Sequence, residues 1–358
     1  MKKILSLILS ILMIFSLCTL AACGSEPAAE ENKTEESKPA DSTALKFGTA
    51  VYVATPVATS ATEEEAGAGE LNVTIAAVSV DANGKIVDCA LDTMQSTASY
   101  TTEGKAEAAA GEFKTKYELG FDYNMVKYGA GKAIDGGDVT KEWFEQVDAF
   151  KALVLGKTAD EVKALVVNNY RGTEEVIGAG CTIGIAELAA AVDKAYNAAV
   201  ASDVTANDTL KVTAYTELES TDASEENGGS QKLSVYTCAA AVNAEGKVVK
   251  SVSDCVEVEF TFDTKGATTF NSAVEVLSKR EKGFDYNMVK YGKGKALNGG
   301  DVTKEWFEQA DAFDSLCVGK TGAEIKALIA ETGRGVEGVQ TAGCTIYVSG
   351  LVGAASKL

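Results

Sequence analysis

Two short segments of the chain combine residue types and a spacing that could bind a phosphate group. Both read Ala-Gly-Cys-Thr-Ile, at residues 179–183 and 342–346, and the first precedes an alanine-rich stretch with helical periodicity. The first N–H groups of a helix have no partner within it, the helix dipole favours an anion there, and glycine lets the backbone approach that anion. These patterns predict a phosphate site at Thr182 and Thr345. The alternative is that each threonine only caps a helix or ends a strand.

Cysteines beside these threonines suggest a second kind of chemistry. Close to a helix N-terminus the thiols of Cys181 and Cys344 would be more acidic and therefore reactive; the alternative is a small buried side chain. Beyond residue 23 the chain has six cysteines and no Cys-x-x-Cys pair. We therefore expect buried or partly buried free thiols, and neither a disulfide framework nor a metal cluster.

Acid–base and metal chemistry have little support in the sequence. The chain contains no histidine, which is the commonest general base near neutral pH and the commonest metal ligand. Asp138 and Glu142 could share one face of a helix, and the same pair recurs at Asp301 and Glu305. No pattern around them indicates a cleft or a raised pKa. We interpret these carboxylates as helix-start residues, and we assign no catalytic residue and no metal site.

The elements that would position these residues occur twice. Residues 121–150 match residues 284–313, both with GGDVTKEWFEQ, and the match continues without a gap to the two Ala-Gly-Cys-Thr-Ile segments. Upstream, a glycine-containing turn between β-branched stretches indicates a hairpin in each copy. A repeat of this length is too long for a solenoid. The sequence predicts two tandem homologous domains, residues 45–203 and 208–358, joined by residues 204–207.

Each copy has the pattern of an α+β domain, with a small, mostly antiparallel sheet packed against helices. Strands come first and a loop-rich middle follows. Then comes a helix whose apolar stripe includes Trp143 and Phe150, with Thr140 as its expected cap. Capping boxes of the form Thr-x-x-Glu start a second helix at Thr158 and Thr321. The polar residues that we interpret as a solvated face of the first helix are Glu145, Gln146, Glu308 and Gln309.

The N-terminal residues have the pattern of a targeting segment. Two lysines precede an apolar run and then Leu-Ala-Ala-Cys, which resembles the lipobox of bacterial lipoproteins, in which Cys23 would carry the lipid. We predict a lipoprotein signal peptide at residues 1–22 and an acidic, disordered tether at residues 23–44. The protein would then be extracytoplasmic and lipid-anchored to the cell membrane. The alternatives are an ordinary signal peptide and an uncleaved anchor.

The charge balance argues against nucleic acid as a partner. The chain has 33 Lys+Arg against 52 Asp+Glu, a formal net charge of −19. A surface with this excess of carboxylates repels polyanions, so we expect no nucleic-acid binding.

The order of these parts resembles the FMN-binding domains that carry covalently attached flavin in bacterial redox lipoproteins and respiratory subunits. The shared features are an exported domain, a hairpin with an Asp-x-x-Gly-Lys-Ile turn, a Gly-x-Thr core and a closing alanine-rich helix. In that family an extracytoplasmic flavin transferase attaches the FMN phosphate to the threonine. The resemblance implies FMN at Thr182 and Thr345. The motif positions that it places beside the flavin phosphate are Gly180, Gly343, Cys181 and Cys344. A flavin ring would also need aromatic faces and hydrogen-bond partners, and the candidates for these are Tyr123, Tyr286, Asn124 and Asn287.

The motif also departs from that family's pattern. The family usually has serine before the glycine, alanine after it and a hydroxyl residue two places beyond the threonine. Here alanine and cysteine flank the glycine, and the later position holds Gly184 in one copy and Tyr347 in the other. Covalent FMN, noncovalent FMN and a flavin-free relative therefore all stay open.

These observations lead to two hypotheses about function. The leading one is a membrane-anchored flavoprotein of two tandem repeats that carries electrons to a membrane redox partner and does not itself transform a substrate. The alternative is a cofactor-free surface lipoprotein whose repeats serve ligand binding or adhesion through the FDYNMVKYG segments that begin at Phe121 and Phe284.

Overall fold

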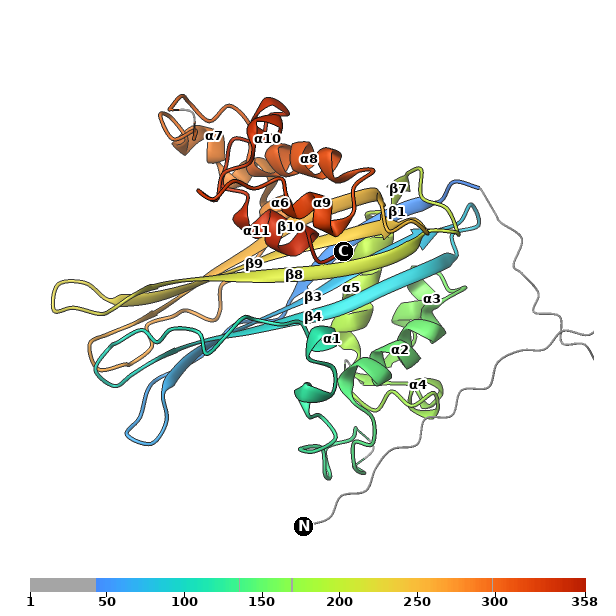
Figure 1. Ribbon diagram of the computed structural model, residues 1–358. Coiled ribbons are helices and arrows are strands. Elements are labelled where there is room, and N and C mark those ends of the chain that lie inside the picture. The colour runs from blue at the N-terminus through green and yellow to red at the C-terminus, as the bar shows by residue number, and fades with distance from the viewer. Residues whose placement is uncertain (1–42, 135, 169, 298) are drawn as a thin grey trace, which may run out of the picture. The chain divides into compact units, whose positions relative to one another are not determined.

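Two antiparallel sheets, one from each repeat, pack face to face in the computed structural model (Figure 1). The structure describes residues 43–134, 136–168, 170–297 and 299–358. The predicted signal peptide, Cys23 and all but the last two residues of the predicted tether lie outside the described residues.

Each sheet is built on three long strands in the same order. In the first repeat β3 lies between β1 and β4, and in the second β9 lies between β8 and β10. The short strands β2 and β7 extend the first sheet by pairing with β3 and β1, and β5 and β6 form a separate small ladder. The strands are β1 (Lys46–Val53), β2 (Val57–Thr59), β3 (Gly67–Val80), β4 (Ile86–Tyr100), β5 (Val166–Val167), β6 (Arg171–Gly172), β7 (Val200–Ala201), β8 (Thr209–Thr221), β9 (Gly229–Val242) and β10 (Val248–Phe262).

The helices follow the strands in each repeat and cover the outer face of that repeat's sheet. Figure 1 shows the two sets of helices on opposite sides of the paired sheets. In the first repeat they are α1 (Lys116–Leu119), η1 (Gly120–Tyr123), α2 (Trp143–Val154), α3 (Ala159–Lys163), α4 (Glu174–Gly178) and α5 (Ala186–Asn197). In the second they are α6 (Lys279–Lys282), η2 (Gly283–Tyr286), α7 (Met288–Tyr291), α8 (Trp306–Cys317), α9 (Gly322–Lys326), α10 (Glu337–Thr341) and α11 (Ser349–Ala355).

Along the central strands, side chains on one face pack against the other sheet, and those on the other face pack against the helices. In β3, Leu71 and Val73 face the second sheet, where they join a cluster that includes Leu233 of β9. Ala76 and Val78 lie on the opposite face of β3 and pack under the helices with Trp143. Because both faces of each sheet are covered, β3 and β9 are buried along most of their length. The shared cluster joins the described residues of both repeats into one compact unit.

The predicted α+β class is confirmed, and so are several local signals. Thr158 and Thr321 are the caps of α3 and α9, each within a capping box. The predicted cap at Thr140 is wrong, because α2 begins two residues later than expected. Glu142 is its N-cap, and Glu145 closes the capping box. Within the described residues, no helix is long and apolar enough to cross a membrane.

Candidate functional site

The start of α2 holds the Ala-Gly-Cys-Thr-Ile loop in place through one buried side chain. Gln146 accepts hydrogen bonds from the backbone N–H of Thr182 at 2.7 Å and from its hydroxyl at 3.0 Å. The amide of Gln146 donates in turn to the carbonyl oxygen of Lys141 at 2.9 Å. The prediction of a solvated face is therefore wrong for Gln146, which is fully buried. A buried amide that satisfies three partners fixes one loop conformation.

The second repeat reproduces this arrangement. Gln309 is also fully buried and accepts from the N–H and hydroxyl of Thr345 at 2.8 and 3.1 Å. In both copies, the threonine's two donors therefore point at a glutamine of the supporting helix. Neither threonine caps the following helix, since the N-cap positions are Ile185 and Val348.

A second buried polar residue ties the FDYNMVKYG loop to the same helix. The carboxylate of Glu142 accepts from the backbone N–H groups of Met125 at 2.7 Å and Val126 at 3.3 Å. Glu305 makes the same two bonds, to Met288 at 2.7 Å and Val289 at 3.2 Å. The start of α2 therefore orients two loops at once, and the duplicated GGDVTKEWFEQ segment is the positioning element for both.

A lysine lies against the glycine of each threonine loop. Gly180 has φ +99°, a conformation that favours glycine, and a Cβ there would lie 2.1 Å from Nζ of Lys141. In the second copy Gly343 has φ +101°, with Lys304 Nζ at 2.3 Å from that position. Among the described residues neither lysine forms an ion pair with a carboxylate. An unneutralised ammonium at this point would suit an anionic group.

The cysteines of the motif point into the core. Cys181 and Cys344 are fully buried among the apolar residues under the helices. Burial raises the pKa of each thiol to about 11, so both are protonated near neutral pH. The other described cysteines, Cys89, Cys238, Cys255 and Cys317, are also free and buried, which confirms the expectation of buried free thiols. No group of cysteine and acidic side chains in the described ranges could hold a metal ion.

The tyrosine and asparagine expected near the flavin lie in the loop held by Glu142. Asn124 has a left-handed backbone, φ 57°, and donates to the carbonyl oxygen of Asp122 at 2.6 Å. The hydroxyl of Tyr123 lies 3.4 Å from the side-chain oxygen of Gln95 on β4. Tyr286 and Asn287 repeat this geometry, with Glu257 in place of the glutamine.

Among the described residues, the space for a ligand next to the motif differs between the two repeats. In the first, a cavity of about 180 Å³ lies against Ile183 and Gly184 of the threonine loop. In the second, the position equivalent to Thr74 is Tyr236, whose ring lies 2.2 Å from where a Cβ of Gly350 would stand. Cavities that take drug-sized ligands hold roughly 300–1,000 Å³. The second repeat therefore does not fit the ring system of a flavin, and the first has room for part of one.

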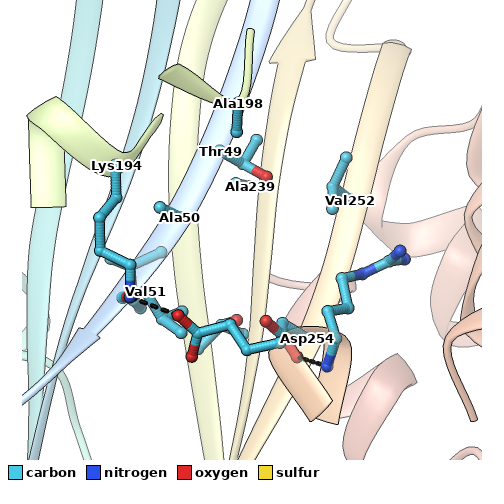
Figure 2. Close-up of a pocket in the computed structure, with 12 residues that line it drawn as sticks. Thr49, Ala50, Val51, Lys194, Ala198, Ala239, Val252 and Asp254 are labelled. Carbon is cyan, nitrogen blue, oxygen red and sulfur yellow. Dashed lines mark hydrogen bonds and ion pairs between the residues drawn. The ribbon is translucent and has the colours of Figure 1, made fainter. Parts of the chain in front are cut away.

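A different cavity, of about 280 Å³, lies between the two repeats (Figure 2). At its edge, Lys194 of α5 donates to the carbonyl oxygen of Val51 at 2.8 Å and pairs with Glu281 of the second repeat. Asp254, also at the edge, accepts from the backbone N–H of Arg280 at 3.1 Å. Since its charged groups are already partnered, we assign this cavity to the packing of the repeats.

The equivalent space on the other side of the paired sheets holds a buried carboxyl group. This second cavity has a volume of about 430 Å³, and its lining includes Asp92 and Lys357. Lys357 pairs with Glu118 of the first repeat at 2.9 Å. Burial raises the pKa of Asp92 to about 7, although backbone N–H groups of Thr93 and Tyr117 donate to it and lower the pKa.

The exposed side chains of the FDYNMVKYG loops are the most unusual feature of the surface. Phe121 and Tyr128 are 71% and 62% exposed, and their counterparts Phe284 and Tyr291 are 72% and 63% exposed. Lys127 lies 4.9 Å from the ring centre of Tyr128, and Lys290 repeats this contact at 5.1 Å. We call each set an aromatic loop. The loops are Phe121, Val126, Lys127 and Tyr128 in the first repeat and Phe284, Val289, Lys290 and Tyr291 in the second.

Comparisons with protein-family models, with curated proteins and with solved structures find no match.

Proposed function

We propose that the protein is an extracytoplasmic, lipid-anchored binding protein whose two aromatic loops recognise the same ligand. The proposal rests on which positions are identical in the two repeats. Residues 121–150 and 284–313 are identical at 26 of 30 positions, whereas the central strands β3 and β9 agree at 5 of 14. Packing constrains buried positions, yet all four residues of each aromatic loop are exposed and identical. Identical exposed apolar side chains indicate a shared binding task.

The chemistry of the aromatic loops favours a glycan with anionic groups. Exposed phenylalanine and tyrosine rings can stack on the apolar faces of sugar rings, and the lysine beside each tyrosine can pair with a carboxylate or phosphate on the same ligand. Each aromatic loop thus carries an exposed lysine on a chain of net charge −19. The two loops lie on opposite sides of the paired sheets (Figure 1), so one chain could hold two segments of a polymer and gain avidity.

The experiment is an array of neutral and anionic oligosaccharides probed with the mature protein. We expect binding to anionic glycans by the wild type and loss of that binding in the variant Phe121→Ala/Tyr128→Ala/Phe284→Ala/Tyr291→Ala. Exposed positions tolerate such changes, since surface substitutions usually alter stability by about 0.5 kcal/mol or less. Capture of no glycan by the wild type, or equal capture by the fourfold variant, would overturn the proposal.

A flavin electron carrier is the second candidate, restricted to the first repeat. Lys141 beside Gly180 suits a phosphate, and the adjacent cavity offers Trp143 as an aromatic wall. FMN bound there would supply one- or two-electron redox chemistry, and Lys141 would hold its phosphate end. A visible spectrum and an intact mass of the purified mature protein, before and after incubation with a flavin transferase and FAD, decide the question. A colourless protein with no mass added at Thr182 would remove this candidate.

A further inference from the structure

The cavity beside the threonine loop of the first repeat has walls that differ from the equivalent region of the second repeat at several positions. Its walls include Thr74, Thr93, Trp143 and Leu188. In the second repeat, tyrosine and cysteine replace the two threonines, as Tyr236 and Cys255, while the tryptophan and leucine are kept. The first repeat therefore has open space where the second has a packed ring.

The charges at the cavity differ in the same way. Lys116 lines the cavity, with its ammonium 5.4 Å from the ring centre of Trp143, and among the described residues it forms no ion pair. Its counterpart Lys279 is almost fully buried and pairs with Glu257 at 2.9 Å. Position 95, the counterpart of Glu257, is a glutamine. The lysine of the first repeat thus has no carboxylate of its own.

The lining of the cavity also includes an acidic residue. Glu187, in the first turn of α5, lines the same cavity, and the part of the chain that the structure describes gives it no ion-pair partner. The second repeat has Gly350 at this position, where the ring of Tyr236 fills the space. The cavity of the first repeat therefore carries one cation and one anion that are not paired with each other, and its apolar lining includes Trp143, Met125 and Leu188.

A tyrosine ring lies over a glycine close to the threonine loop in both repeats, at exchanged positions. In the first, the ring of Tyr170 lies over Gly184, 2.3 Å from where a Cβ would stand; in the second, the ring of Tyr347 lies 3.4 Å from the equivalent point on Gly333. These are the same two sequence positions with tyrosine and glycine swapped. Both rings are more than half exposed. The tyrosine is therefore kept in the second repeat, where Tyr236 fills the space, as well as in the first.

From this juxtaposition we infer that the first repeat contains a binding site for a free α-amino acid with an apolar side chain. Lys116 pairs with the carboxylate of the ligand, Glu187 with its ammonium, and the wall of Trp143, Met125 and Leu188 receives the side chain. A volume of about 180 Å³ suits a molecule of this size and is below the roughly 300–1,000 Å³ of sites that enclose drug-sized ligands. The site is separate from the aromatic loops and goes beyond the proposed function.

The test is isothermal titration of the mature protein with leucine, valine, methionine and phenylalanine. We expect saturable 1:1 binding of at least one of them, and at least about tenfold weaker binding in Lys116→Met and in Glu187→Lys, because each variant removes one charge-assisted contact to the ligand. The variant Thr74→Tyr/Glu187→Gly copies the second repeat and should abolish binding. Lys114→Met, an exposed lysine that does not line the cavity and belongs to neither aromatic loop, is the matched control and should bind as the wild type does.

The outcomes separate this site from the proposed function. Loss of glycan binding in the aromatic-loop variants with amino-acid binding intact would leave this inference standing. No binding of any of the four amino acids at 10 mM ligand, or unchanged affinity in both Lys116→Met and Glu187→Lys, would overturn it. The exposed position of Glu187 keeps that variant informative if the double variant fails to fold. A flavin bound in the cavity would also overturn it.

Discussion

Replacing Gln146 by leucine should destabilise the protein out of proportion to the size of the change. The two side chains are similar in volume, so the main loss is polar: the N–H of Thr182, its hydroxyl and the carbonyl of Lys141 lose partners at 2.7, 3.0 and 2.9 Å. An unsatisfied buried group costs about 1–3 kcal/mol. Lys141 and Thr182 are half-buried, so water can recover part of this, and we expect a net loss of about 2–4 kcal/mol.

The assay is urea unfolding followed by tryptophan emission. The chain has two tryptophans, Trp143 and Trp306, one beside each glutamine, so a Trp306→Phe background reports on the first repeat alone. With a slope near 3 kcal/mol/M, the midpoint should fall by about 1 M. Ala152→Gln, an exposed position on the same helix, is the control and should shift it by less than about 0.2 M.

A midpoint for Gln146→Leu within the range of that control would refute the reasoning, because the glutamine would then hold nothing that matters for stability. Gln309→Leu should show the same loss in the second repeat. Since the two sites lie on opposite faces of the paired sheets, their effects should add.

Three further predictions follow from burial and packing. The raised pKa of Asp92, about 7 in the fold against 3.8 as the ordinary value, means that the folded state holds this proton more tightly. Stability from this group should therefore fall as pH rises from about 4 to about 7, and Asp92→Asn should remove that slope when its urea unfolding is compared with the wild type at pH 5 and pH 8. In a chain that carries both Cys18→Ser and Cys23→Ser, the six buried thiols should be silent to a thiol reagent at pH 8 until guanidinium is added, and rapid labelling of the native protein would contradict their burial. Gly350→Ala should cost about 1–3 kcal/mol, measured by thermal unfolding, because the new Cβ would lie 2.2 Å from the ring of Tyr236.

More of the fold than of the candidate site could be predicted from the sequence. Period-2 alternation, Gly turns and the Thr-x-x-Glu boxes are local signals, and the structure has β3, β9, α3 and α9 where these signals predict them. The face-to-face packing of the two sheets had no local signal, because it depends on which side of each strand meets a partner distant in the chain.

The burial of Gln146 also had no local signal in the sequence. A glutamine next to a helix start usually faces water, and only the threonine loop, 36 residues further on, gives it partners. The alternative hypothesis placed the FDYNMVKYG segments on a binding surface, but the sequence could not show which of their side chains are exposed, since large aromatic side chains are usually mostly buried. A comparison of identity between the repeats, position by position, could have raised the question, because the loop stays identical where the strands diverge.

The most direct measurement is an isothermal titration of the mature protein with the glycan that binds best on the array. We expect two equivalent sites per chain, one site in Phe121→Ala/Tyr128→Ala or in Phe284→Ala/Tyr291→Ala, and none when all four rings are removed. Binding that survives the loss of all four rings would contradict the claim that the aromatic loops are the recognition surface.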